Sequence, residues 1–283
     1  MVTPFDEQGR VDEDATVALM RHLVANGSDG VVLSGTTGEA STLTDPEKIR
    51  LFELGMQTLG GTATVIAGTG SNDTAHSVHM TEVAAKIGVD AVLAVTPYYN
   101  RPPRAGLLGH VRAIAEVGVP VILYNIPTRS VVNMPPDLIA EMTEIPGVIG
   151  LKEANPDQAD AVLAIPGLQV WAGNDDLFLQ VALGGGEGVI SVASHLVGPQ
   201  MQRISQAARA GDAATATQID SSLHALYEGL FTTSSPILIK AALAMLGVIP
   251  NGHLRLPLVD ATDEECTTMA GILEAHGLLV NAS

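Results

Sequence analysis

The sequence predicts an α/β protein built as a (β/α)8 barrel with a C-terminal helical appendage. Eight short runs rich in apolar and β-branched residues recur along the first 195 residues, separated by stretches with helical spacing of apolar residues. Strands that alternate with helices indicate parallel strands joined by right-handed crossovers. The runs are apolar throughout, as expected for strands covered on both faces. Eight such units favour the TIM barrel, and the alternative is an open, doubly wound sheet.

The expected strands follow one another in chain order. They cover residues 2–5, 29–35, 64–70, 90–97, 120–127, 148–154, 168–174 and 188–195. Between them, apolar residues recur at the spacing of one helix face. This spacing is clearest over residues 11–25, 46–59 and 74–87.

After His195 the strand pattern stops and only helices are indicated. They are expected over residues 199–209, 213–230, 236–246 and 263–277. No low-complexity segment or linker separates this part from the strands before it. We therefore expect a barrel with the catalytic site over residues 1–210, and a helical region packed on the barrel over residues 211–283.

Composition restricts the class of function. The chain has 283 residues, 46% of them hydrophobic, and a net charge of −17, which argues against nucleic acid and anionic membrane surfaces as partners. Cys266 is the only cysteine, so no intrachain disulfide can form and a reducing compartment is expected. No apolar run reaches the roughly twenty residues of a membrane span, and the first residues lack a signal-peptide pattern. A cytoplasmic protein with neither nucleic-acid nor membrane partners is expected.

Lys152 is the most informative single residue. It is one of four lysines and ends a short apolar run that reads as a buried strand, whereas Lys48, Lys86 and Lys240 lie in helical stretches where an ammonium group can reach water. Burial lowers the pKa of a lysine, and a neutral amine can attack a carbonyl to form a Schiff base. The alternative is a structural lysine paired with a carboxylate such as that of Glu153.

Polar segments follow several expected strands, where the loops of a barrel converge on its catalytic face. The turn Gly-Thr-Thr-Gly-Glu (35–39) offers hydroxyls and closely spaced N–H groups that suit a small anion such as a carboxylate, or it is an ordinary glycine turn. Three of the four tyrosines, Tyr98, Tyr99 and Tyr124, lie at the ends of the fourth and fifth strands. Tyr99 and Tyr124 can relay protons if a hydroxyl such as that of Thr36 bridges them.

Other polar residues carry weaker signals. Arg129 presents a fork that matches a carboxylate, although an ordinary surface ion pair explains it equally well. His76 and His79 are three residues apart on an expected helix with no third ligand nearby, so no metal site is expected. His195 stands at the end of the last expected strand and receives no role.

Five segments, taken in chain order, carry a family resemblance. They are Gly-Thr-Thr-Gly-Glu (35–39), Thr-Pro-Tyr-Tyr-Asn-Arg-Pro (96–102), Tyr-Asn-Ile-Pro-Thr-Arg (124–129), Gly-Leu-Lys-Glu-Ala (150–154) and Gly-Val-Ile-Ser-Val (188–192). Together they resemble the dihydrodipicolinate synthase family, within the N-acetylneuraminate lyase superfamily. The resemblance implies a lyase that condenses pyruvate with L-aspartate 4-semialdehyde to 4-hydroxy-tetrahydrodipicolinate, in lysine and diaminopimelate biosynthesis.

The resemblance also implies a role for each site residue. Lys152 forms the Schiff base with pyruvate, so no separate cofactor is expected, and Tyr124 donates and accepts protons in a relay with Thr36 and Tyr99. Substrate-binding residues are Thr37 for the pyruvate carboxylate, Arg129 for the carboxylate of aspartate semialdehyde, and Ile190 and Gly173 beside them. In the family the residue matching Tyr99 reaches a neighbouring subunit, which implies a homo-oligomer, a dimer of dimers.

Two departures and two alternatives accompany the resemblance. Family members carry more residues before the first Thr-Pro, so either the native start lies upstream of Met1 or the first strand is unusually short. In lysine-inhibited members the effector site corresponds to Ala40, Ser41, Asp45, Lys48, Asn72, His76 and Tyr98, and here His76 replaces a glutamate while Lys48 replaces a histidine. Weak or absent feedback by lysine is therefore expected. The alternative functions are an aldolase for a sugar acid, such as N-acetylneuraminate or 2-keto-3-deoxygluconate, and a silent barrel that binds a keto acid.

Overall fold

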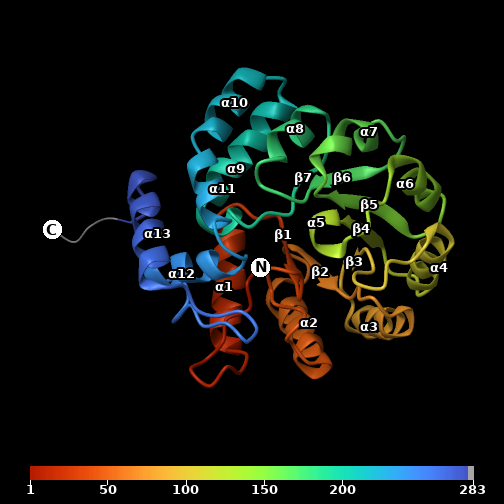
Figure 1. Cartoon of the computed structure of the whole chain (residues 1–283), viewed down its shortest axis with the longest axis horizontal. Coiled ribbons are helices and arrows are strands. Elements are labelled where there is room, and N and C mark those ends of the chain that lie inside the picture. The colour runs from red at the N-terminus through yellow and green to blue at the C-terminus, as the bar shows by residue number, and fades with distance from the viewer. Residues whose placement is uncertain (280–283) are drawn as a thin grey trace.

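A computed structural model describes residues 1–279 of the chain, and Figure 1 shows a curled parallel sheet surrounded by helices. Its strands pair in sequence order without a crossover between non-neighbours. They are β1 (Gly30–Leu33), β2 (Thr64–Gly68), β3 (Ala91–Val95), β4 (Val121–Asn125), β5 (Val148–Glu153), β6 (Gln169–Ala172) and β7 (Gly188–Val189). The barrel prediction is confirmed. The doubly wound alternative is wrong, because the strand order never reverses.

Helices surround this sheet, and the one-turn helix α5 (Pro127–Ser130) lies at the ends of its strands (Figure 1). They are α1 (Glu13–Ala25), α2 (Asp45–Leu59), α3 (Thr74–Ile87), α4 (Arg104–Ala115), α5 (Pro127–Ser130), α6 (Pro136–Thr143), the 3₁₀ turn η1 (Pro156–Gln158), α7 (Ala159–Leu163), α8 (Phe178–Leu183) and α9 (Ser194–Arg209). Several begin where the sequence supplies a cap. Asp12 and Asp73 accept backbone N–H bonds at the starts of α1 and α3, which satisfies donors that a helix N-terminus leaves free.

The expected first strand, residues 2–5, is wrong. The only β-type contact there is a single antiparallel bridge between Phe5 and Val11. Residues 1–3 are instead held by separate bonds. The Met1 amine donates to the Val32 carbonyl at 2.7 Å, the Val2 N–H donates to His195 Nε2 at 3.1 Å, and the Thr3 hydroxyl donates to the Gly38 carbonyl at 2.7 Å. Pro4 has no N–H to give to a ladder, so the strand pattern cannot continue.

Two apolar layers place the site. The larger cluster fills the space between sheet and helices, and Val92, Leu123 and Leu151 contribute from the strands. A smaller cluster fills the inside of the barrel, where Leu93 and Ile122 pack with Tyr124. The alternation of side chains along each strand sends successive residues to these two layers. Both faces are therefore apolar, which explains why the strand runs did not alternate in polarity.

The C-terminal helices are α10 (Ala213–Ser221), α11 (His224–Leu230), α12 (Ile237–Met245) and α13 (Asp263–Ala275). The expectation of one helix over residues 213–230 is wrong, because the helix is interrupted at Ser222 and Leu223. Helix α9 starts before the expected 199–209 and is kinked at Val197, two residues ahead of Pro199. The last four residues of the expected helical region, 280–283, lie outside the described residues. No helix in the described residues, 1–279, has both the length and the apolarity to span a membrane.

The expectation that Lys240 reaches water is wrong. Its side chain is fully buried on α12, and its ammonium donates to Glu39 Oε1 at 2.8 Å. Helical spacing alone did not reveal this, because the partner carboxylate lies far away in the sequence. Lys86 is exposed and Lys48 is half-buried, as their helical positions allow.

Candidate active site

Lys152 and Tyr124 lie side by side on neighbouring strands. They are direct partners in the register of β4 and β5. The Lys152 ammonium lies 4.3 Å from the centre of the Tyr124 ring, which stabilises a cation. Both side chains are buried, Lys152 with 8% of its surface exposed. The strand pairing therefore brings the predicted nucleophile and the predicted proton donor to one point inside the barrel.

Glu153 does not pair with Lys152. Successive strand residues point to opposite faces, and the Glu153 carboxylate accepts bonds from Asn125 Nδ2 at 2.8 Å and Gln158 Nε2 at 2.7 Å. Burial raises the pKa of Glu153, against these hydrogen bonds, which lower it. Lys152 forms no ion pair with any group in residues 1–279. The alternative of a lysine paired with Glu153 is wrong.

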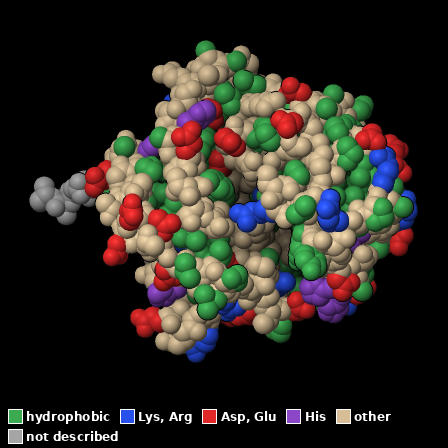
Figure 2. Space-filling model, in the orientation of Figure 1, with side chains coloured by type: hydrophobic (Ala, Val, Ile, Leu, Met, Phe, Trp, Pro, Cys, Tyr) green, Lys and Arg blue, Asp and Glu red, His purple; other side chains and the backbone are tan. Residues whose placement is uncertain are grey.

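A cavity of about 470 Å³ opens beside Lys152 and Tyr124. Six of the eight predicted site residues line this active-site cavity: Lys152, Tyr124, Thr36, Thr37, Arg129 and Gly173. They come from the ends of β1, β4, β5 and β6, at the catalytic face of a barrel. Figure 2 shows this side of the molecule hollowed near its centre, with Lys or Arg side chains beside the hollow.

The other two predicted residues lie elsewhere. Ile190 packs on the cluster inside the barrel and lines a different cavity, between β1 and β7. Tyr99 is 87% exposed and lies on the loop after β3 with a φ of 74°, a conformation that non-glycine residues rarely adopt. Tyr99 does not line the active-site cavity or either of the two cavities near it, whereas its neighbour Tyr98 lines the cavity that adjoins the active-site cavity.

The glycine turn, residues 35–39, is tied together by its own backbone. The N–H groups of Gly38 and Ala40 donate to the Gly35 carbonyl, and the Glu39 N–H donates to the Thr36 carbonyl. These three N–H groups are therefore used within the turn. This leaves Thr36 and Thr37, which both face the active-site cavity, as the parts of the turn that can bind an anion.

Sequence reasoning missed several residues that line the same cavity. His224, Tyr227 and Phe231 reach it from the α11 region, and Asp175 reaches it from the loop after β6. Burial raises the pKa of Asp175, while its bonds from the Ser191 hydroxyl and the Ala193 N–H lower it. The α11 residues carried no signal, because they lie in a helix with no strand end before them. Asp175 sits in the Gly-Asn-Asp-Asp segment (173–176), which follows an expected strand and was a usable signal.

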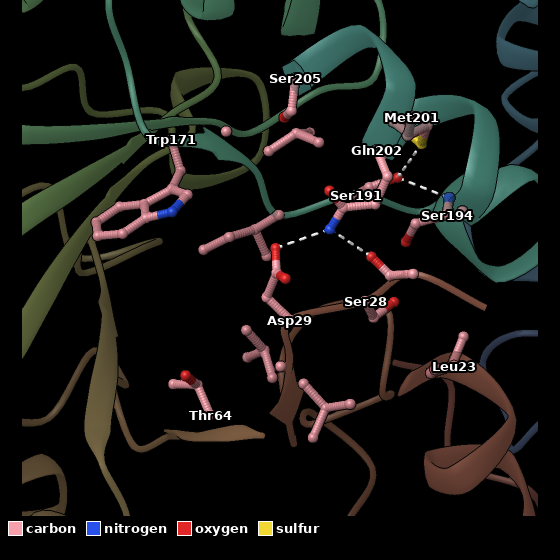
Figure 3. Close-up of a pocket in the computed structure, with 18 of the residues that line it drawn as sticks. Leu23, Ser28, Asp29, Thr64, Trp171, Ser191, Ser194, Met201, Gln202 and Ser205 are labelled. Carbon is pink, nitrogen blue, oxygen red and sulfur yellow. Dashed lines mark hydrogen bonds between the residues drawn. The ribbon is translucent and has the colours of Figure 1, made fainter. Parts of the chain in front are cut away.

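A second cavity, of about 250 Å³, lies where the barrel closes between β1 and β7. Figure 3 shows its lining: Asp29 and Thr64 on one side, Trp171 on the other, and Gln202 bonded to Asp29 across it. His195 also lines it, and its neutral ring accepts from Val2 and donates to the Val192 carbonyl. His195, unassigned from the sequence, is thus a structural link between α9 and the start of the chain.

A third cavity, of about 510 Å³, adjoins the active-site cavity and shares Thr36, Tyr124, Ile126 and Arg129 with it. Six of the seven positions expected for an effector line it: Ala40, Ser41, Lys48, Asn72, His76 and Tyr98. The seventh, Asp45, accepts a bond from His76 Nε2 at 3.0 Å and lies 3.9 Å from the Lys48 ammonium. Its carboxylate is therefore already engaged by two basic side chains.

His76 and His79 do not form a metal site with other groups. His76 is bonded to Asp45, and His79 is exposed. Across residues 1–279, no three His, Cys, Asp or Glu side chains gather closely enough to hold a metal ion.

Comparison with known proteins gives consistent matches. Residues 1–276 match the model of the "Dihydrodipicolinate synthetase family". A 4-hydroxy-tetrahydrodipicolinate synthase from Symbiobacterium thermophilum is 48% identical, over 99% of this chain and 97% of the relative. Another, from Heliobacterium modesticaldum, is 45% identical over 98% of this chain and 94% of the relative.

Solved structures agree. The dihydrodipicolinate synthase of Cyanidioschyzon merolae, with lysine bound, superposes with a TM-score of 0.95 at 40% identity, covering 99% of this chain and 97% of that one. The chloride-inhibited enzyme of Acinetobacter baumannii, complexed with pyruvate, has a TM-score of 0.95 at 34% identity and the same coverage of 99% and 97%.

Proposed function

The chain belongs to the dihydrodipicolinate synthetase family and is a 4-hydroxy-tetrahydrodipicolinate synthase of lysine biosynthesis, and from this premise we propose how its residues carry the reaction. The relatives decide between the functions that the sequence left open, because those at 43–48% identity over nearly the whole chain are all named as this synthase. The substrates are pyruvate and aspartate semialdehyde. The pyruvate complex of the Acinetobacter enzyme supports the first of them.

Lys152 is the nucleophile in this proposal. Its amine attacks the keto carbon of pyruvate, and loss of one water leaves an imine between the lysine nitrogen and that carbon. The position of Lys152 between β4 and β6, beside the Tyr124 ring, is the observation that carries the proposal. No separate cofactor takes part, since pyruvate itself is held as the Schiff base.

Tyr124 moves the protons that this chemistry requires. It is buried next to the Lys152 ammonium and shares the active-site cavity with Thr36. A hydroxyl at this position can protonate the departing oxygen of the pyruvate carbonyl and later remove a proton from its methyl group. Thr36 and Tyr99 complete the relay, and Tyr99 does so from a neighbouring subunit.

The remaining residues hold the substrates. Thr37 binds the pyruvate carboxylate and Gly173 lines the place of pyruvate. A contact from the backbone of Ile190 to pyruvate stays a prediction, because Ile190 lines the cavity between β1 and β7. Arg129 projects from the one-turn helix α5 into the cavity and receives the carboxylate of aspartate semialdehyde. Two carboxylates are thus recognised by two separate elements.

The exposed loop after β3 supports a homo-oligomer. Tyr98 and Tyr99 are 39% and 87% exposed, and Tyr99 has no partner within residues 1–279 that explains its left-handed backbone. We infer a dimer through this loop and a dimer of dimers overall, in the cytoplasm. We also infer that lysine binds weakly, because Asp45 is already engaged by His76 and Lys48.

Trapping of the imine tests the proposal. Borohydride with pyruvate should add a reduced pyruvyl mass to the peptide that contains Lys152, and Lys152→Arg should abolish the adduct because arginine stays protonated. Lys86→Arg, on an exposed lysine, is the matched control and should leave trapping unchanged. An adduct on another lysine would refute the mechanism. A coupled assay with aspartate semialdehyde then measures the complete reaction.

A further inference from the structure

The glycine turn is tied to the C-terminal helices by a buried ion pair. Lys240 of α12 and Glu39, the last residue of the turn, are 0% and 1% exposed at their side chains, and their charged atoms lie 2.8 Å apart. Each charged group also contacts a second neighbour. The Lys240 ammonium lies 4.2 Å from the centre of the Phe5 ring, and Glu39 Oε2 accepts the Arg255 N–H at 3.1 Å.

This pair sits behind the part of the turn that faces substrate. Thr36 and Thr37 line the active-site cavity, and Glu39 follows two residues later with a φ of 56°. A left-handed non-glycine residue persists only where its surroundings hold it. The surroundings here are Lys240 and Arg255 on the carboxylate, and the Thr3 hydroxyl on the Gly38 carbonyl.

A buried ion pair contributes little net free energy of unfolding. The cost of removing two charges from water offsets much of their attraction, and apolar residues of similar size often stabilise as well. What such a pair supplies is a fixed distance and direction between two elements, since a short charged hydrogen bond has strict geometry. The elements joined here are α12 and the substrate-facing turn.

We propose that Lys240 and Glu39 are positioning residues of the active site, whose ion pair fixes residues 35–39 so that Thr36 and Thr37 meet pyruvate. The inference rests on the proposed role of Thr37 in binding the pyruvate carboxylate. Neither Lys240 nor Glu39 lines the active-site cavity. Arg129, on α5, is not tied to this pair, so recognition of aspartate semialdehyde should be independent of it.

The test compares the two substrates in the full-length protein. Lys240→Met should lower kcat/KM for pyruvate by about tenfold to a hundredfold, the range expected when a binding group shifts by an ångström. The kcat/KM for aspartate semialdehyde should change little. It is measured at saturating pyruvate and divided by the number of active sites that borohydride trapping detects. An equal fall for both substrates would overturn the proposal, because general loosening of the fold acts on both.

A double variant separates geometry from stability. Glu39→Gln with Lys240→Met leaves no unpaired buried charge, so thermal stability should recover relative to either single variant. The pyruvate defect should remain, because the tie between α12 and the turn is still missing. Full recovery of pyruvate use together with stability would contradict the proposal. If Lys240→Met does not fold, the double variant carries the same comparison.

Two controls complete the design. Leu243→Ala removes a fully buried side chain from the same helix without touching the pair, and it should destabilise the protein without a pyruvate-selective defect. A selective defect in this variant would overturn the role of the ion pair. Thr37→Val tests the premise. If Thr37→Val leaves kcat/KM for pyruvate intact, the assignment of Thr37 is wrong. If Thr37→Val lowers it but Lys240→Met does not, Thr37 keeps its role and only the positioning role of Lys240 is refuted.

Discussion

Arg129 reaches the active-site cavity from a helix of a single turn, directly after β4. Its guanidinium is exposed, and no ion pair holds it within the described part of the chain. A free guanidinium at the mouth of a cavity is suited to receive the carboxylate of an incoming substrate.

Arg129→Ala should therefore raise the KM for aspartate semialdehyde by about tenfold or more, with little change for pyruvate, because a bidentate contact to one substrate is lost. Steady-state kinetics with each substrate varied in turn measures this. Arg104→Ala is the matched control, since that arginine is exposed and paired with Asp137 and Glu141 far from the cavity. Equal rises for both substrates would reduce Arg129 to a structural role.

The burial of a single residue could be predicted where the residues next to it in the sequence determine what surrounds it. Lys152 was placed correctly because its short apolar run forms β5, which buries the lysine in the barrel wall. Lys240 was misplaced because its burial depends on Glu39, a partner that no local pattern reveals. His224, Tyr227 and Phe231 were missed for the same reason, since only tertiary packing brings α11 to the cavity.

At the scale of elements, the loop after β3 combines unusual backbone angles with exposed side chains. Tyr99 and Arg101 both have positive φ values, of 74° and 49°, and Pro102 and Pro103 follow. Such a loop leaves Tyr99 exposed and available to a neighbouring molecule. In the proposed dimer it meets the active site of the neighbouring subunit.

Mixing two inactive variants tests that arrangement. Tyr99→Phe should disable the relay in the neighbouring site, and Lys152→Ala should disable its own site. Hybrid dimers then contain one site with an intact lysine and an intact tyrosine, so part of the activity should return. Each variant alone at the same total concentration is the control. No recovery, once subunit exchange is shown by mass spectrometry, would place Tyr99 in its own subunit.

The strand elements were predicted well because their apolar runs are bounded by glycine and proline, and seven of the expected strands are present. The first run failed because its pattern contains Pro4, which has no N–H to donate to a ladder. One helix was expected over residues 213–230 where the structure has two, α10 and α11. The apolar spacing continues across Ser222 and Leu223, but the helical backbone is interrupted there.

At the scale of the whole molecule, the barrel closes between β1 and β7 through residues 1–3 and His195. Burial, and next the Met1 ammonium, lower the pKa of His195 from 6.5 to about 3. Burial also lowers the pKa of the Met1 amine to about 5, with a smaller contribution from Lys152. His195 is therefore seated in its neutral form.

A neutral buried histidine stabilises the fold above its unfolded pKa of 6.5, and this stabilisation is lost as the pH falls toward 3. The free energy of unfolding should fall by up to about 1.4 kcal/mol per pH unit in that window for this one group. Denaturant unfolding at several pH values measures the slope. His195→Gln should reduce it, whereas His79→Gln, on the exposed face of α3, should not. The same slope in His195→Gln would show that other groups dominate.

The link between Glu39 and Lys240 also sets an order of events during synthesis. The two residues are 201 positions apart, so the turn emerges from the ribosome long before its partner. A carboxylate cannot be buried without that partner at low cost, and Glu39 must stay hydrated until α12 arrives. A nascent chain with all seven strands translated therefore still lacks a finished pyruvate pocket. If the ion pair positions the turn as proposed, pyruvate binding becomes possible only once α12 has reached Glu39.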